Sequence, residues 1–184
     1  MKTFLLKKTA VTPLIAFLLV FAAVALTSRN YGLTWDEPYY VNHSDRIAAW
    51  FKSLVTSGNP FTPENIRHHW NYDRLHNCHP PFSKLTGIFL KNTLGEILYR
   101  NSLYAYRLSS AFWAALMGAL LALYLLRAYD DSLTALLGAG LFALTPRFFA
   151  HCHFYATDMP VASLSFLVLY LYSMYPDSRS TVTA

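Results

Sequence analysis

The chain has 184 residues, of which 54% are hydrophobic, 16% are aromatic and only 14% are charged. A soluble domain usually has roughly 25% charged residues, and here the apolar residues gather in long blocks, so the composition argues against a soluble core built from short amphipathic elements. The net charge of +5 comes from scattered basic residues that flank the apolar blocks. This distribution favours membrane lipid over nucleic acid as the partner.

The apolar blocks predict an all-α integral membrane protein with about four transmembrane helices, because crossing a bilayer takes about 17–25 residues. The four segments are residues 11–27, 109–126, 133–150 and 160–175. The first follows lysines and contains several alanines, so a cleaved signal peptide is the alternative for that segment. The later segments hold the chain in the membrane in either case.

A short polar stretch, Arg127 with Asp130 and Asp131, separates the second and third apolar segments. It predicts a tight turn, so these two helices should form an antiparallel hairpin. Small residues would let the two backbones approach closely. They are Gly118, Ala119, Gly138 and Gly140.

Basic residues near the ends of the segments set the expected orientation, since they favour the cytoplasmic side. With four spans, one side carries Lys2, Lys7, Lys8, Arg127 and Arg179. The N-terminus is therefore expected in the cytoplasm of a multi-pass protein, and a bacterial inner or plasma membrane is the favoured location. A long loop, 28–104, and a short turn, 151–159, then face the external compartment.

The long external loop has its own order. Residues 45–55 and 82–98 carry apolar side chains at helical spacing, which predicts helices lying along the membrane interface. Residues 57–81 are rich in proline, asparagine and histidine and are predicted to be an irregular connection. All seven histidines fall in the two external segments. Any chemistry is therefore expected on that side.

The first candidate motif is the acidic pair Asp36-Glu37, just beyond the first apolar segment. Carboxylates at a membrane surface can act as a general base or a metal ligand, because burial and neighbouring charges shift their pKa values. The alternative is a solvated helix start, with Asp36 as the N-cap.

The second motif runs from His79 through two prolines to Lys84. Tandem prolines end the preceding chain and begin a helix, which places Lys84 in the first helical turn. There the ammonium group could bind the phosphate of a lipid-linked ligand, or it could simply extend to the head groups.

The third motif lies between the last two apolar segments, where Asp158 precedes Pro160 at a predicted helix start. Asp158 could hold a divalent cation together with Asp36 or Glu37. Arg147 lies near the membrane boundary, where an unpaired charge is costly, so it is either functional or extended into the head groups.

Histidines and cysteines offer two further hypotheses. A zinc site would draw on His76, Cys78, His79, His151, Cys152 and His153, although their spacing fits no zinc signature. A disulfide between Cys78 and Cys152 is conceivable in an oxidising compartment, but chance placement of two cysteines is favoured.

Taken in order, the three motifs resemble the N-terminal part of membrane glycosyltransferases with the GT-C fold, in the group of protein O-mannosyltransferases and aminoarabinose transferases. The matching pieces are Asp36-Glu37 after the first span, the stretch from His79 to Lys84, and the Thr157-Asp158-Met159-Pro160 sequence after the third. The similar part would be residues 1–176, followed by a polar tail at 177–184.

The resemblance implies transfer of a sugar from a polyprenyl-phosphate donor to an acceptor hydroxyl on the external face. Asp36 would be the general base, and Glu37 and Asp158 would orient the acceptor or hold a divalent cation. Lys84, with His79, Arg147 and Arg107, would bind the donor phosphate. Complete enzymes of this kind have more spans, so a non-catalytic membrane subunit or truncated homologue that binds a partner or lipid is the alternative.

Overall fold

The computed structural model describes residues 2–56, 59–70 and 79–175, and over residues 2–9 it describes the backbone alone. These described residues are helical and contain no strand. The main helices are α1 (Lys2–Thr27), α2 (Glu37–Thr56), α3 (Pro63–Trp70), α4 (Phe82–Leu90), α6 (Ser102–Tyr129), α7 (Ser132–Ala143), α8 (Pro146–His151) and α9 (Asp158–Ser173). The expected all-α fold is confirmed.

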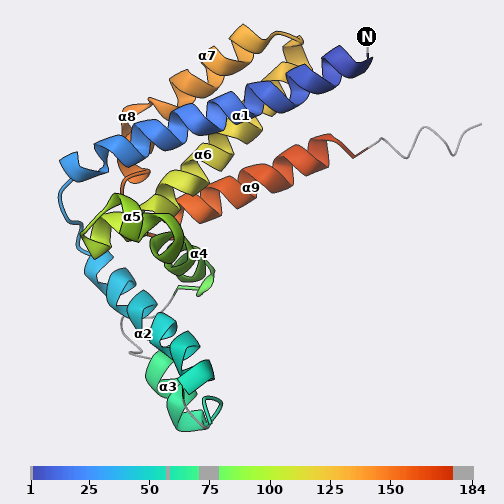
Figure 1. Ribbon diagram of the computed structural model, residues 1–184. Coiled ribbons are helices and arrows are strands. Elements are labelled where there is room, and N and C mark those ends of the chain that lie inside the picture. Colours follow the sequence, from blue (N-terminus) through green and yellow to red (C-terminus); the bar gives the residue numbers. More distant parts are fainter. Residues whose placement is uncertain (1, 57–58, 71–78, 176–184) are drawn as a thin grey trace, which may run out of the picture.

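Helix α6 is the centre of the molecule. It packs against α1, α7 and α9, and these four helices form an elongated bundle (Figure 1). The buried face of α6 is rich in small residues, among them Ala111, Ala114 and Ala115, which let the neighbouring helices approach. Helices α2 and α3 project from one end of the bundle, which we call the junction end (Figure 1).

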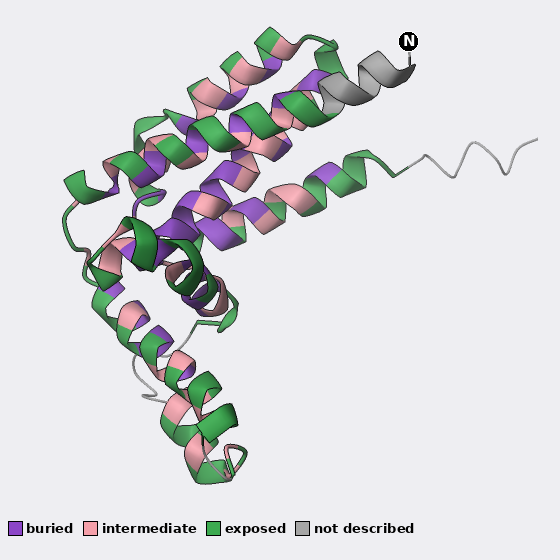
Figure 2. Cartoon of the chain, in the orientation of Figure 1, coloured by how far each residue is buried: buried purple, intermediate pink, exposed green. Residues whose placement is uncertain are grey.

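The outer faces of the bundle are apolar. Leu18 and Leu19 of α1, Leu141 of α7 and Leu169 of α9 each expose more than half of their surface. Figure 2 shows these helices buried on the side that faces α6 and largely exposed on the other. Extended exposed apolar surface of this kind is typical of a protein that contacts lipid or a partner.

Among the residues that the structure describes, two helical stretches are long and apolar enough to cross a membrane, at Ala10–Asn30 and Ser102–Tyr129. The second of these extends beyond the predicted segment 109–126 at both ends. Helix α9 is somewhat short for a span, and α7 is shorter still, because its 12 residues cover only about 18 Å at 1.5 Å per residue. Within the described ranges, two helical stretches are thus candidates for spans by length and composition.

The predicted third span, 133–150, is interrupted in the structure. Helix α7 ends at Ala143, and a separate short helix, α8, begins at Pro146. Proline has no N–H and disfavours helical backbone in the residue before it, and Thr145 indeed has ψ of 122°. The prediction of one continuous helix was therefore wrong at this point.

The predicted hairpin between α6 and α7 is confirmed. Asp130 ends α6 in a left-handed conformation with φ of 50°, and the Asp131 side chain accepts a 2.7 Å bond from the Thr134 N–H at the start of α7. Of the small residues, Gly138 packs closely on Leu125 of α6. Gly118 instead approaches α1, where an added Cβ would lie 3.0 Å from Val20, and Gly140 has open space around it.

The segment between α1 and α6 is more helical than expected. Residues 45–55 lie within α2, and residues 82–98 form α4, a π-helical turn η2 (Lys91–Gly95) and the short α5 (Glu96–Leu98), so both helical predictions are confirmed. The region 57–81, predicted to be irregular, contains α3, whose first turn is capped by Thr62. Residues 71–78 and the tail 177–184 lie outside the described residues.

Candidate functional site

A buried ion pair organises the junction end. The carboxylate of Glu37, at the start of α2, accepts 2.7 Å and 2.6 Å bonds from Nε and Nη2 of Arg107 on α6. The side chains are 0% and 1% exposed, respectively. The remaining lone pairs of Glu37 accept backbone N–H groups from Thr34 at 3.0 Å and Tyr155 at 2.8 Å. Four donors thus saturate the carboxylate.

Arg107 is saturated in the same way. Its other three N–H groups donate to the backbone carbonyls of Ser28, Tyr31 and Gly32, at 3.0, 2.9 and 2.6 Å. A guanidinium has five N–H donors, and all five are used. The pair therefore joins the end of α1, the start of α2, α6 and the turn before α9. Glu37 was expected to act in catalysis or hold a metal and Arg107 to bind phosphate, but in this arrangement both serve to position the surrounding segments.

A second cluster surrounds Tyr40, one helical turn after Glu37. The His79 ring stacks on the Tyr40 ring at 5.6 Å, and Lys84 Nζ lies 5.7 Å from the centre of the same ring. Lys84 also donates to the His79 carbonyl at 3.2 Å. The Tyr40 hydroxyl lies 3.4 Å from the hydroxyl of Thr157. Residues of the second and third motifs therefore meet on Tyr40, which lies one turn after the acidic pair of the first motif.

Tyr155 packs against Tyr40, at 6.0 Å between ring centres, and helps to fix the same segments. Its hydroxyl lies 2.8 Å from the Ser44 hydroxyl on α2 and donates to the Lys84 carbonyl on α4 at 3.4 Å. Its ring stacks on Tyr106 of α6 at 5.0 Å. Burial raises the pKa of the Tyr155 hydroxyl, so it stays protonated and acts as a hydrogen-bonding group rather than a base.

Of the three candidate carboxylates, Asp36 and Asp158 are exposed to solvent. Asp36 precedes α2, and its carbonyl accepts the Tyr40 N–H at 3.2 Å. Asp158 is the first residue of α9, as predicted, and pairs with His151 at 3.2 Å in an exposed contact. Tyr40 thus bonds to the backbone of Asp36 and to Thr157, the neighbour of Asp158. Arg147 is exposed in the first turn of α8 and, within the described part of the chain, takes no part in this cluster.

Sequence reasoning missed His43. The residue is 6% exposed, and neither ring nitrogen makes a hydrogen bond of good geometry with a described residue, although the Trp70 backbone interacts with the ring. The nearby Ser83 hydroxyl, next to Lys84, is also buried and has no hydrogen-bond partner among the described residues. One signal was present: residues Glu37, Tyr40, Ser44 and Ile47 recur at helical spacing, and His43 falls beside this buried stripe of α2.

The described residues among the six zinc candidates give the zinc hypothesis no support. His76 and Cys78 lie outside the described residues. The hypothesis of a Cys78–Cys152 disulfide therefore also falls outside what the structure describes. Both ring nitrogens of His153 are engaged, by Thr27 at 2.7 Å and the Phe149 carbonyl at 2.6 Å. Burial raises the pKa of Cys152 to about 12, which disfavours the thiolate that binds zinc. In the described ranges, no group of three metal-ligating side chains forms.

Acidification should destabilise the fold through two buried histidines. Burial is the main cause that lowers the pKa of His43 and of His153. The positive charge of Lys84 lowers the pKa of His43 further, whereas the interaction with the Trp70 backbone raises it. Since the unfolded histidines titrate near 6.5, the unfolded state binds more protons just below that pH, and stability falls from about pH 6.5 downward. The melting temperature should drop by several degrees between pH 7.5 and 5.

The variant His43→Phe should make this pH dependence shallower, because it removes one of the two titrating rings and keeps the ring volume. The same change at exposed His68 is the matched control. An identical pH slope in the wild type and in His43→Phe would contradict the assignment.

Comparisons with models of protein families, with curated proteins and with solved structures gave no match to this chain.

Proposed function

We propose that this protein transfers a sugar from a polyprenyl-phosphate carrier to an acceptor hydroxyl at a membrane surface. The observation that carries the proposal is the meeting of three separate motifs at the junction end. Asp36-Glu37, His79 to Lys84, and Thr157-Asp158 lie far apart in the sequence, yet contacts of Glu37, Tyr40 and Tyr155 join them. These are the segments on which the resemblance to GT-C glycosyltransferases rests.

The membrane placement proposed here is a four-span bundle of α1, α6, the α7–α8 unit and α9. Its support is the apolar outer surface of the bundle and the two helices of spanning length. The start of α1, the α6–α7 turn and the end of α9 lie at one end of the bundle (Figure 1). Basic residues near these points favour the cytoplasm. The junction end then faces the external compartment.

The proposed chemistry uses three exposed groups, on Asp36, His79 and Asp158, together with Lys84, which is only 2% exposed beside Tyr40. Asp36 takes the proton from the acceptor hydroxyl while the oxygen of that hydroxyl attacks the anomeric carbon of the donor sugar. The bond from that carbon to the carrier phosphate breaks, and the phosphate leaves with the electron pair. A single displacement of this kind inverts the configuration of the anomeric carbon. Lys84 and His79 lie together on Tyr40, where they can stabilise the phosphate charge. Asp158 orients the acceptor or helps to hold a divalent cation.

A buried hydroxyl beside Lys84 also favours a ligand there. The Ser83 hydroxyl is buried and has no hydrogen-bond partner among the described residues, whereas the buried His43 ring has the Trp70 backbone as a partner. Unpaired buried polar groups are uncommon in native proteins and often mark a site where a ligand or water completes the hydrogen bonding. A phosphate or sugar hydroxyl would supply a partner for the Ser83 hydroxyl.

The test is transfer by the purified chain in detergent, with a short polyprenyl-phosphate sugar as donor. Asp36→Asn should lower the rate at least about 100-fold, the usual contribution of a general base, while donor binding and melting temperature stay unchanged. Lys84→Gln should weaken donor binding. The matched control is Glu64→Gln, which neutralises an exposed acid on α3, outside the Tyr40 cluster.

Donor binding without transfer by the wild type would favour the alternative of a non-catalytic subunit or truncated homologue. Full activity of Asp36→Asn would overturn its role as the base.

A further inference from the structure

A pocket of about 560 Å³ lies away from the Tyr40 cluster, between α2 and the α4–η2–α5 segment. One wall is formed by α2, from Asp45 to Val55, and the other by residues from Ile88 to Glu96. The second wall contains the π-helical turn η2, a feature that is rare in proteins and frequent at functional sites. The lack of a side chain at Gly95 lets this turn pack closely on α6, since an added Cβ would lie 2.7 Å from the Ala105 side chain.

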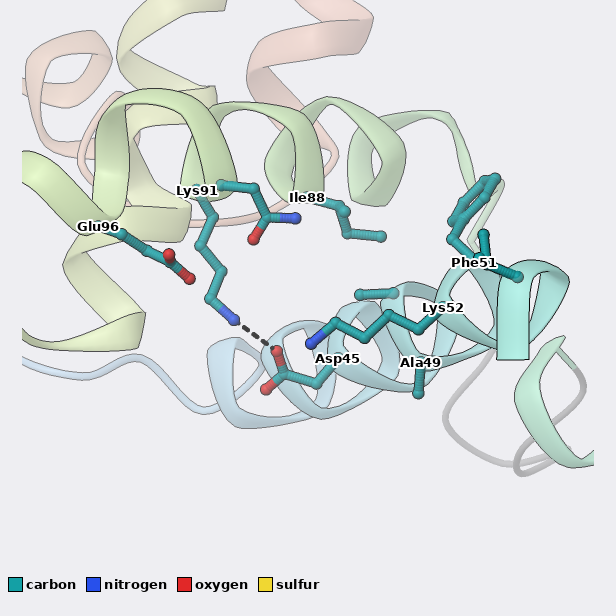
Figure 3. A pocket seen from close by; sticks show the side chains of 10 residues that line it. Asp45, Ala49, Phe51, Lys52, Ile88, Lys91 and Glu96 are labelled. Atoms are coloured by element: carbon teal, nitrogen blue, oxygen red, sulfur yellow. Dashed lines mark hydrogen bonds and ion pairs between the residues drawn. The ribbon is translucent and has the colours of Figure 1, made fainter. Parts of the chain in front are cut away.

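The pocket has a charged part. Lys52 and Lys91 extend from opposite walls toward Asp45, and Glu96 reaches into the same space (Figure 3). Lys91 pairs with Asp45 at 3.0 Å and lies 4.9 Å from the ring centre of Tyr106. The Tyr106 hydroxyl also donates to the same Asp45 oxygen, at 2.7 Å. The network fixes the Lys91 ammonium group at Asp45, and the exposed side chains of Lys52 and Glu96 extend into the same space.

The pocket also has an apolar part. Ala48, Phe51 and Val55 of α2 face Ile88 of α4 across it. Val55 is 90% exposed and Phe51 is 41% exposed, so this side of the pocket opens onto apolar surface. A ligand that fills the whole pocket therefore needs both charges and a hydrocarbon part.

We propose that this pocket binds the head group of a zwitterionic phospholipid with a primary amine, of the phosphatidylethanolamine type. The lipid phosphate lies between Lys52 and Lys91, the ammonium group donates to Glu96, and an acyl chain follows Phe51 and Val55. The two lysines and two acids of the pocket sum to zero charge, which matches a zwitterion better than an anionic lipid. This assignment rests on the proposed membrane location but does not depend on sugar transfer.

The chemistry also separates this lipid from its close relatives. A primary ammonium offers three N–H donors to Glu96, whereas the trimethylated choline group offers none. Phosphatidylglycerol keeps the phosphate but has no positive group, so Glu96 would be left facing a neutral head group. Selectivity for the amine is therefore the distinguishing property of the site.

The experiment uses the purified full chain in detergent with the dihexanoyl forms of phosphatidylethanolamine, phosphatidylcholine and phosphatidylglycerol, and bound lipid is counted by native mass spectrometry. The wild type should prefer phosphatidylethanolamine. Lys52→Gln should weaken it about tenfold, the loss of one charge-assisted contact. Glu96→Lys should reverse the preference toward phosphatidylglycerol, which a merely structural role for Glu96 would not do.

The matched control is Glu64→Gln, an exposed acid on α3 that should leave lipid preference unchanged. Asp36→Asn should also bind the lipid as the wild type does, so that loss of transfer and loss of lipid binding are told apart. The proposal is overturned if the wild type binds the three lipids equally, or if Glu96→Lys keeps the original preference.

Discussion

Replacement of Arg107 by methionine should destabilise the protein by about 3–5 kcal/mol, the usual effect of removing one partner from a buried ion pair. The Glu37 carboxylate would stay buried with two of its four donors lost, and three backbone carbonyls would lose their partner. For a chain of this size the melting temperature in detergent should fall by about 10 °C or more. Circular dichroism at the helix band would measure it.

Arg107→Lys should not restore stability, because a lysine has three donors on one nitrogen and cannot reproduce the planar arrangement that reaches five acceptors. Glu37→Gln should also destabilise, since it removes the negative charge and turns N–H donors toward the guanidinium. The control is Lys91→Gln, which breaks an exposed pair worth at most about 1 kcal/mol. Equal melting temperatures for Arg107→Met and Lys91→Gln would show that the buried pair is not a central support.

Local signals in the sequence predicted much of the fold. The tandem prolines before Phe82 place the start of α4, and Asp158 with Pro160 marks the start of α9. The polar turn at Asp130 and Asp131 predicts the hairpin, and the structure shows how each acid serves it, one as a left-handed helix end and the other as a cap. These features succeed because a few adjacent residues determine them.

Features that depend on distant residues were missed. Arg107 lies outside the apolar segment 109–126, because hydropathy alone placed the start of the helix after it. The helix continues back to Ser102 because Arg107 finds Glu37, 70 positions earlier, and the carbonyls after α1. Hydropathy also predicted one continuous helix through Pro146, although proline disfavours the interior of a helix and already indicates a break there. Residue type suggested site roles for Glu37 and Arg107. That the two side chains pair with each other could be seen only in the folded structure.

Gly87 should be the position in the site that least tolerates a side chain. A Cβ there would collide with the hydroxyl and ring of Tyr155, which is 1% exposed and held by Ser44. Gly87→Ala should therefore cost about 1–3 kcal/mol, the usual penalty for overpacking, although alanine favours a helix by about 1 kcal/mol. The comparison is Gly140→Ala in α7, where open space surrounds the glycine and the same helix preference should raise the melting temperature.

The two alanine variants separate local packing from helix propensity, because both place the same methyl group in a helix interior. Displacement of Tyr155 in Gly87→Ala should also loosen the Lys84 segment, so donor binding should weaken together with stability. In Gly140→Ala donor binding should stay as in the wild type. If both variants stabilise the protein equally, Tyr155 does not pack on α4 as described, and the link that brings Lys84 to the Asp36 and Asp158 segments is lost with it.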